Sequence, residues 1–288
     1  MSDALSQPTA SNANPGGADQ HEIPFLQLVG VTKRFGGLAA VNDLSFSLRQ
    51  GEVLGIIGPN GAGKSTMVNL IGGSMAPTSG TIFYQGHEIS RLSPNRRAHL
   101  GIVRTFQVTQ PFMGLDVREN VMVGAFFGQQ GLNRTKALRV ADDVLERVNL
   151  AHKATFKGDQ LTIADRKRLE MARALATNPK LLLLDEVMAG LTATEVAQAV
   201  DLIQQINKTG VTVLIIEHIV RAIASVSNRI LVMHHGRKIA EDEPSQVLSD
   251  PKVIEAYLGE RYAKKRIQED SNVLSITQED LQQSGEDR

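Results

Sequence analysis

The sequence lacks cysteine and tryptophan, and it has only 3 tyrosines and 9 phenylalanines among 288 residues. Without cysteine there is no disulfide framework, thiolate metal site or cysteine nucleophile. No apolar run approaches the roughly 18 residues that a bilayer-spanning helix needs. The 31 Lys and Arg residues balance 31 Asp and Glu residues, which argues against a protein held to nucleic acid by a general phosphate attraction. These absences favour a soluble globular protein of a reducing compartment.

Both ends of the chain are polar and poor in large apolar residues. Residues 1–22 are rich in Ser, Ala, Asn, Pro and Gly, and they lack the basic start and apolar stretch of a signal peptide. Segments of this composition bury too little surface to offset the entropy of ordering. We therefore predict two mobile tails, at 1–22 and 263–288, around a body at residues 23–262.

Within the body, short apolar runs alternate with helical patterns. Residues 52–58, 181–186 and 211–218 have the continuous apolar character of strands that are buried on both faces. A loop or helix follows each run. This alternation predicts an α/β fold with a doubly wound, mostly parallel sheet.

Other segments predict smaller additions to this core. Residues 25–35, 40–50 and 81–89 favour a separate antiparallel patch, and residues 229–243 favour a hairpin that turns at His235-Gly236. The pattern is mainly helical within residues 108–179. We expect this middle block to form a helical subdomain inserted in the α/β core.

The strongest motif is a phosphate-binding loop that follows the first apolar run and precedes an apolar helix. It consists of Gly58, Pro59, Asn60, Gly61, Ala62, Gly63, Lys64, Ser65 and Thr66. Glycines let the backbone curl so that several N–H groups face the phosphates, and the helix N-terminus adds its positive end. Lys64 would supply a point charge, and the Ser65 hydroxyl would ligate Mg²⁺. A ligand-free Gly-rich turn would not require this spacing and context together.

Charged side chains end the two other apolar runs. Asp185 and Glu186 follow four leucines, and His218 follows the run that starts at Val211. In an open α/β sheet, ligands bind at the carboxyl ends of the strands. Asp185 would hold the Mg²⁺ shell, Glu186 would polarise the attacking water, and His218 would donate to a γ-phosphate oxygen. The alternatives are ordinary loop solvation for the acids and a surface or capping role for the histidine.

Taken together, these motifs resemble the ATP-binding cassette (ABC) transporter ATPases, over nearly all of residues 23–262. The phosphate loop, the 181–186 run and the sequence IIEH that ends at His218 occur in the family's order. The resemblance implies a P-loop NTPase fold that hydrolyses ATP with Mg²⁺. It also implies that two such subunits sandwich two nucleotides, with each site completed by the partner's signature sequence.

Two further positions follow from this resemblance. Thr105-Phe106-Gln107 is similar to the family's Q-loop, which would make Gln107 a ligand of Mg²⁺ and of the attacking water. Phe35 stands where the family places an aromatic side chain that stacks on adenine. The alternative for Phe35 is a place in the core of a strand.

The signature sequence departs from the family's usual L-S-G-G-Q, because residues 161–165 are LTIAD. Thr162 keeps a hydroxyl that would reach the partner's nucleotide. Ile163 and Ala164, however, replace glycines that allow close backbone approach. We expect a weaker or rearranged contact there. Thr192 also stands where the family commonly has Asp, which affects the communication expected between the two sites.

A narrower resemblance concerns transport. Residues 35–48, 189–191 and 253–260 look like importer ATPases for branched-chain amino acids and related small polar compounds. The implied protein powers an importer from the cytoplasmic face of the cell (inner) membrane as a peripheral subunit. Its implied partners are transmembrane permease subunits, a second ABC ATPase in a homodimer or heterodimer, and indirectly a periplasmic or extracellular substrate-binding protein. No nucleic acid is expected.

Two other functions remain open from the sequence. Export of a lipid or polysaccharide shares every catalytic motif, whereas a soluble ABC ATPase acting on nucleic acid or ribosomes would typically carry coiled-coil insertions or two cassettes. Residues 108–130 are the candidate permease contact. The apolar candidates there are Phe112, Met113, Phe126 and Phe127. These side chains are equally compatible with the core of the helical block. The basic run at 166–168 favours a solvated helix face.

Overall fold

The phosphate-loop strand lies in the middle of a six-stranded sheet. The structure is a computed structural model that describes residues 23–105, 111–128 and 132–258. The sheet order is β10-β9-β3-β8-β7-β6. Its strands are β3 (Val53–Ile57), β6 (Ile102–Arg104), β7 (Leu181–Asp185), β8 (Thr212–Ile216), β9 (Arg229–His234) and β10 (Arg237–Asp242). Only β10 runs antiparallel to its neighbour, so the predicted mostly parallel sheet is confirmed.

A second, antiparallel sheet has the order β2-β1-β4-β5. Its strands are β1 (Leu26–Phe35), β2 (Leu38–Leu48), β4 (Ser79–Tyr84) and β5 (His87–Glu88). This sheet is the antiparallel patch that the sequence predicts. The predicted late hairpin is also present: β9 and β10 meet at His235 and Gly236, which both have positive φ, 47° and 76°.

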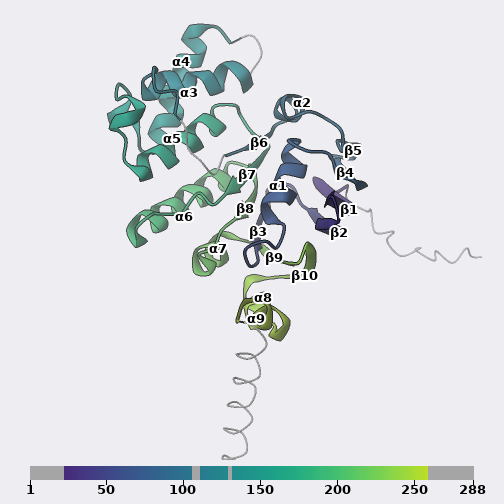
Figure 1. Cartoon of the computed structure of the whole chain (residues 1–288). Coiled ribbons are helices and arrows are strands. Elements are labelled where there is room, and N and C mark those ends of the chain that lie inside the picture. The colour runs from purple at the N-terminus through teal and green to yellow at the C-terminus, as the bar shows by residue number, and fades with distance from the viewer. Residues whose placement is uncertain (1–22, 106–110, 129–131, 259–288) are drawn as a thin grey trace, which may run out of the picture.

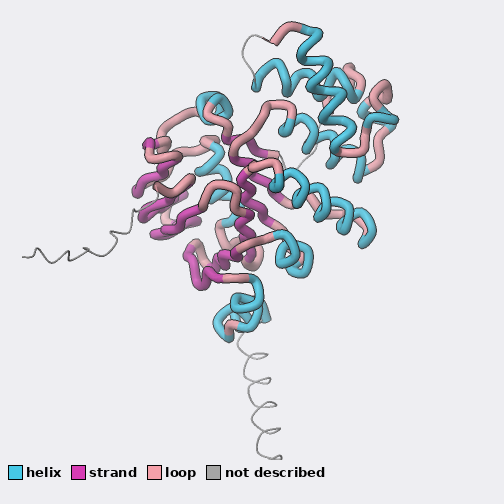
Figure 2. Tube along the Cα trace, turned by 180° about the vertical axis from the view of Figure 1, so that it is seen from behind, coloured by secondary structure: helices cyan, strands magenta, loops and turns pink. Residues whose placement is uncertain are grey.

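Helices cover the parallel sheet and extend from one end of it (Figures 1 and 2). They are α1 (Lys64–Gly72), α2 (Pro94–His99), α3 (Val117–Gly128), α4 (Arg134–Arg147), α5 (Ile163–Leu175), α6 (Ala193–Lys208), α7 (Val220–Val226), α8 (Pro244–Ser249) and α9 (Pro251–Leu258). In Figure 1, α1 lies between the two sheets, while α3, α4 and α5 gather in a block away from the antiparallel sheet. This block is the predicted helical subdomain.

The strands beside the phosphate loop are buried on both faces, which explains their unbroken apolar runs. Every residue of β3, β7 and β8 is buried. Successive side chains point to opposite faces. Leu54 and Ile56 therefore join the core shared with α1 and the antiparallel sheet, whereas Val53 and Ile57 join the core shared with the helices of the other face.

A buried arginine in α2 fixes the end of α1. Arg97 is completely buried, and its guanidinium donates to the carbonyls of Leu70 and Ile71 at 2.5 and 2.6 Å, and to that of Ile89 at 2.6 Å. Burial lowers the pKa of Arg97 to about 10. Because the last carbonyls of a helix have no partner within the helix, Arg97 satisfies groups that would otherwise be buried unpaired.

The structure leaves the predicted domain limits as predictions, because residues 1–22 and 259–288 lie outside the described ranges. No helix in the part of the chain that the structure describes is both long and apolar enough to cross a bilayer.

Candidate nucleotide site

The loop from Gly58 to Gly63 joins β3 to α1 and is closely enclosed by both sheets. Gly58, Gly61 and Gly63 have φ values of 152°, 78° and 98°. A Cβ on Gly58 would lie 2.1 Å from the Met233 carbonyl oxygen, and one on Gly63 would lie 2.2 Å from that of Ala40. Conformation and space therefore both require glycine at positions 58 and 63.

The start of α1 is open to a ligand. Gly63 is the N-cap, and no side chain accepts a hydrogen bond from the first turn at this cap. Unpaired N–H groups at a helix N-terminus attract anions. Ser65 in this turn is exposed and Thr66 is half-buried. Asn60 and Gly61 of the loop are exposed as well, so the loop and this turn together present a surface that phosphate can reach.

Lys64 is buried although it is charged. Its Nζ donates to the carbonyls of Gly58 and Pro59 at 2.7 and 3.0 Å. Burial lowers the pKa of Lys64, and the negative charges of Glu186 and Asp185 offset part of that shift. The structure therefore brings the lysine of the loop close to both predicted acids.

Asp185 ends β7 and is 1% exposed. Its Oδ2 pairs with Arg104 Nη2 at 2.8 Å, whereas its buried Oδ1 has no hydrogen-bond partner among the described residues. A buried carboxylate oxygen without a partner is costly unless water or a cation completes it. A carboxylate oxygen here and a hydroxyl oxygen of Ser65 in the first turn of α1 are donors of the hardness that Mg²⁺ prefers.

Glu186 follows Asp185 and makes a sharp turn. Its φ is 53°, an uncommon value for a residue with a side chain, and its amide donates to the Ile216 carbonyl at 3.0 Å. The turn brings Glu186 Oε1 to 3.0 Å from His218 Nε2, and the His218 side chain is 45% exposed. Two residues that lie 32 positions apart are therefore paired at the carboxyl edge of the sheet.

Gln107 and Phe35, the two positions predicted from the family resemblance, have different outcomes. Gln107 lies outside the described residues, although the buried Thr105, two positions before it, donates its amide to the Leu183 carbonyl at 3.0 Å. Phe35 is 49% exposed, with Lys33 Nζ 5.5 Å from the centroid of its ring. The alternative that placed Phe35 in the core is wrong, and its adenine-stacking role stays a prediction.

Thr162 is the N-cap of α5, and its hydroxyl is used within its own chain. The hydroxyl donates to Asp165 Oδ2 at 2.7 Å and accepts from the Asp165 amide at 3.2 Å. Lys153 Nζ pairs with the same Asp165 oxygen at 2.6 Å. Burial acts to raise the pKa of Asp165, but hydrogen bonds from Lys153 and Thr162 outweigh it and hold the pKa below its ordinary value. Ile163, next to the cap, is 62% exposed.

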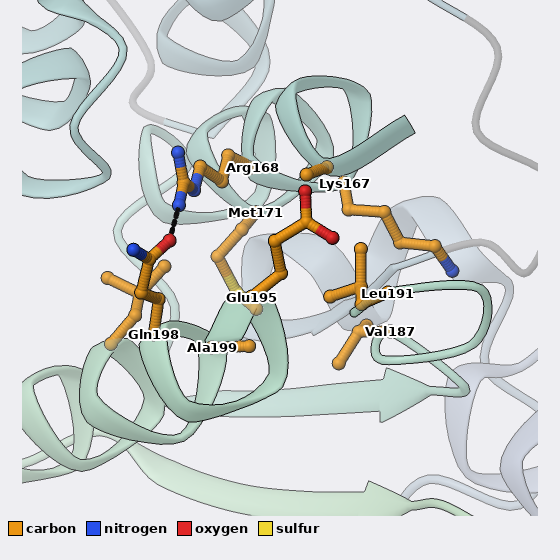
Figure 3. Close-up of a pocket in the computed structure, with 10 residues that line it drawn as sticks. Lys167, Arg168, Met171, Val187, Leu191, Glu195, Gln198 and Ala199 are labelled. Atoms are coloured by element: carbon orange, nitrogen blue, oxygen red, sulfur yellow. Dashed lines mark hydrogen bonds between the residues drawn. The ribbon is translucent and has the colours of Figure 1, made fainter. Parts of the chain in front are cut away.

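The basic run at 166–168 is not the freely solvated face that the sequence favours, because all three residues are half-buried. Lys167 Nζ donates to the Glu186 carbonyl at 2.8 Å, and Arg168 is bonded to Gln198. Figure 3 shows these side chains at a pocket between α5 and α6. It is lined by Ala164, Lys167, Arg168, Met171, Val187, Leu191, Glu195, Gln198, Ala199 and Leu202.

Sequence reasoning missed two charged residues near the acids. Arg104 is the first, and it was missed because nothing in the surrounding sequence indicates its ion pair with Asp185. The other is Glu217, which is 2% exposed. One feature of the sequence could have identified Glu217 as a residue of the site. It is a charged residue that directly follows an apolar strand, at the edge of the sheet where the other acids lie.

The arrangement of a phosphate loop, two sheets and a separate helical block is that of an ATP-binding cassette. The chain belongs to the ABC transporter family, whose model, described as "ABC transporter", matches residues 41–189. It is therefore the ATP-hydrolysing cassette of a transporter. A second family model, described as "Branched-chain amino acid ATP-binding cassette transporter", matches residues 237–263.

Similar proteins extend over most of the chain. The high-affinity branched-chain amino acid transport ATP-binding protein LivG of Salmonella typhimurium is 38% identical over 254 residues, which are 82% of this chain and 98% of that protein. The corresponding protein BraF of Pseudomonas aeruginosa is 38% identical over 251 residues, 82% of this chain and 98% of that protein.

Solved structures agree with the fold. The ADP conformation of an ATP-binding cassette of an ABC transporter superposes with a TM-score of 0.74 at 33% identity, covering 83% of this chain and 100% of that one. A dimeric bacterial ABC transporter cassette gives a TM-score of 0.70 at 27% identity, covering 76% and 98%. The predicted P-loop NTPase fold of the ABC type is confirmed.

Proposed function

We propose that this chain powers a membrane importer of branched-chain or other amino acids. The observation that carries this proposal is the similarity to LivG and BraF over nearly their whole length, together with the branched-chain amino acid family match at residues 237–263. In a transporter, the permease and the binding protein select the substrate. The substrate class proposed for this cassette therefore rests on its similarity to LivG and BraF.

In this proposal the residues of the site divide the work on ATP. The loop amides and Lys64 hold the phosphates, and Phe35 stacks on adenine. Mg²⁺, held by Ser65, by the unpaired Oδ1 of Asp185 and by Gln107, would neutralise charge on the phosphates. Arg104 keeps Asp185 oriented through its ion pair.

The proposed hydrolytic step uses the Glu186–His218 pair. Glu186 orients and polarises the water that attacks the γ-phosphate. His218 is exposed enough to donate a hydrogen bond to a γ-phosphate oxygen, and its bond to Glu186 Oε1 fixes both side chains at one edge. Thr162 of each subunit would face the nucleotide of the other subunit.

The proposed partners are permease subunits at the cytoplasmic face of the membrane and a second cassette, identical or different, with a substrate-binding protein acting through the permease. The exposed fractions of Phe112, Met113, Phe126 and Phe127 are 43%, 59%, 43% and 75%. These side chains are therefore not in the core, and the interpretation of the sequence that placed them in the core of the helical block is wrong. Their exposure supports the segment around them as the surface that receives a permease helix.

The role of Glu186 is tested with the full chain copurified with its transporter partners. We expect Glu186→Gln to abolish ATP hydrolysis while leaving ATP binding within about twofold, because only transition-state stabilisation is removed. Glu146→Gln, on the exposed face of α4, is the matched control and should hydrolyse normally. Unimpaired turnover in Glu186→Gln would refute the assigned role.

The substrate class is tested on the same complex in lipid. We expect branched-chain amino acids, added with the binding protein, to stimulate ATP hydrolysis. Stimulation by a lipid and by no small solute would replace the importer proposal with an exporter.

A further inference from the structure

A buried carboxylate next to the site has no part in the roles proposed above. Glu217 lies just beyond β8 and is 2% exposed. Its Oε1 accepts the Met188 amide at 2.6 Å. Because a buried charge is costly unless it is well hydrogen-bonded, this bond shows which part of the backbone the side chain is placed to hold.

A second charged side chain approaches the same turn from α5. Lys167 Nζ donates to the Glu186 carbonyl at 2.8 Å, and Figure 3 shows its side chain extending from α5 past Leu191. Burial raises the pKa of Glu217, while the Met188 and His218 amides and the Lys167 cation oppose that shift and the negative charge of Glu186 adds to it. The two peptide groups that flank Val187 are therefore held from two sides, one by Lys167 and the other by Glu217.

The turn that these side chains hold is the one that places Glu186. A non-glycine residue at positive φ is strained and persists only where its surroundings enforce the conformation. Glu186 adopts this conformation, and its carboxylate reaches His218 as a result. Glu217 is bonded to the turn after Glu186, at the Met188 amide, and it directly precedes His218 in the chain.

We propose that Glu217 and Lys167 are positioning residues that fix the Glu186–His218 pair in its hydrolytic geometry. Glu217 joins the ends of β7 and β8, and Lys167 ties the same turn to α5. Neither residue touches ATP in this proposal. The inference depends on the roles proposed for Glu186 and His218.

The test measures ATP turnover by the copurified transporter carrying Glu217→Gln, Lys167→Met or both. Glutamine keeps the size of the side chain and one acceptor oxygen, but it loses the charge, which weakens the bond from the Met188 amide. A small displacement of catalytic groups can cost up to about 100-fold. We expect kcat to fall about tenfold in each single variant, with KM for ATP within about twofold, because the phosphate loop is untouched.

The double variant tests whether the two side chains act on one turn. Residues that hold the same element show strong non-additivity. We expect the double variant to be about as slow as the slower single variant, rather than about 100-fold slower than wild type. Lys167→Arg, which keeps a donor and the charge, should restore most of kcat.

The matched control is Glu52→Gln. Glu52 is a buried carboxylate, 7% exposed, that pairs with Arg229 at 2.8 Å at the opposite, amino end of β3. The Glu52→Gln variant should have a lower melting temperature and an unchanged kcat. The proposal is overturned if Glu217→Gln lowers kcat no more than Glu52→Gln, or if it raises KM at constant kcat. If Glu217→Gln fails to fold, Lys167→Met decides by the same criteria.

These outcomes are separable from those of the proposed function. An active Glu186→Gln variant would refute the role of Glu186. An inactive Glu186→Gln variant beside normal Glu217→Gln and Lys167→Met variants would leave that role standing and overturn only the positioning inference.

Discussion

The N-terminus of α1 and the N-terminus of α5 are built in opposite ways. At α1 the N-cap is Gly63 and no side chain caps the first turn. At α5 the Thr162 hydroxyl and the Asp165 carboxylate satisfy each other's backbone amides, and Lys153 neutralises the carboxylate. Thr192 and Glu195 repeat this capping box at α6.

The difference separates a helix start that needs a ligand from one that is complete by itself. Open amides attract an anion, so the start of α1 gains stability when phosphate binds. The start of α5 already has a hydroxyl and a carboxylate in these places. A nucleotide on a partner subunit would have to displace these bonds or accept contacts at their edge. The degenerate LTIAD sequence therefore changes the chemistry of the contact as well as its shape.

The largest effect is expected from closing the α1 end. Gly63→Ala places a Cβ 2.2 Å from the Ala40 carbonyl oxygen at a φ of 98°. We expect the free energy of unfolding to fall by about 2 kcal/mol or more, and ATP binding to be lost. Urea unfolding and equilibrium binding of ATP measure both.

Gly61→Ala is the control for this variant, because its φ of 78° is also positive but its Cβ would meet nothing within 4 Å. It should lose only about 1 kcal/mol, the cost of the left-handed conformation. Equal losses in the two variants would show that crowding by β2 does not shape the loop.

A moderate effect is expected from opening the α5 end with Asp165→Asn. The pKa of Asp165 is held below its ordinary value of 3.8, so the folded state favours the carboxylate. Its contribution to stability is present above that value and is lost as the pH falls through the lowered pKa. Asparagine should therefore cost about 1 kcal/mol at neutral pH, and the difference from wild type should shrink on acidification below about pH 4.

Urea unfolding at several pH values checks this prediction. Asp143→Asn, at an exposed position of α4, provides the control and should follow wild type at all pH values. A gap between wild type and Asp165→Asn that stays constant down to pH 3 would contradict the sign of the shift.

The smallest effect is expected from Ile163→Gly. Ile163 is 62% exposed beside the cap of α5, so its removal should change folding stability little and should let a partner's backbone approach more closely. We expect ATP-driven dimerisation in the assembled complex to tighten a few-fold. Ile23→Gly, at an isoleucine that is 69% exposed, is the control. Unchanged dimerisation and turnover would show that the bulk of Ile163 does not limit the contact.

The sequence was informative wherever a local pattern determines the structure. Strands β3, β7 and β8 are buried on both faces and therefore carry unbroken apolar runs. The glycine spacing of the phosphate loop is set by backbone conformation. Because parallel strands end at one edge, Asp185, Glu186 and His218 were expected near Lys64, and the structure brings these side chains to that edge.

The sequence was uninformative where burial depends on distant packing. Glutamate and lysine side chains most often face solvent. Only the fold shows that Glu217 is buried and that Lys167 is bonded to the Glu186 carbonyl. Arg97, in a short polar segment, is likewise buried, because its guanidinium reaches the last carbonyls of α1. The engagement of the Thr162 hydroxyl required the side-chain geometry of α5.

The strand order has a consequence for how the chain folds while the ribosome synthesises it. β3 is made early, yet its neighbours in the sheet, β8 and β9, come much later: Gly51 at its start bonds Thr212 across 161 residues of sequence. A nascent chain thus exposes an entirely apolar strand and an unsupported phosphate loop until its last third emerges. Such distant pairing slows folding and exposes the chain to aggregation. The phosphate loop is therefore synthesised well before the strands that support it, β8 and β9, so ATP binding has to wait for most of the chain.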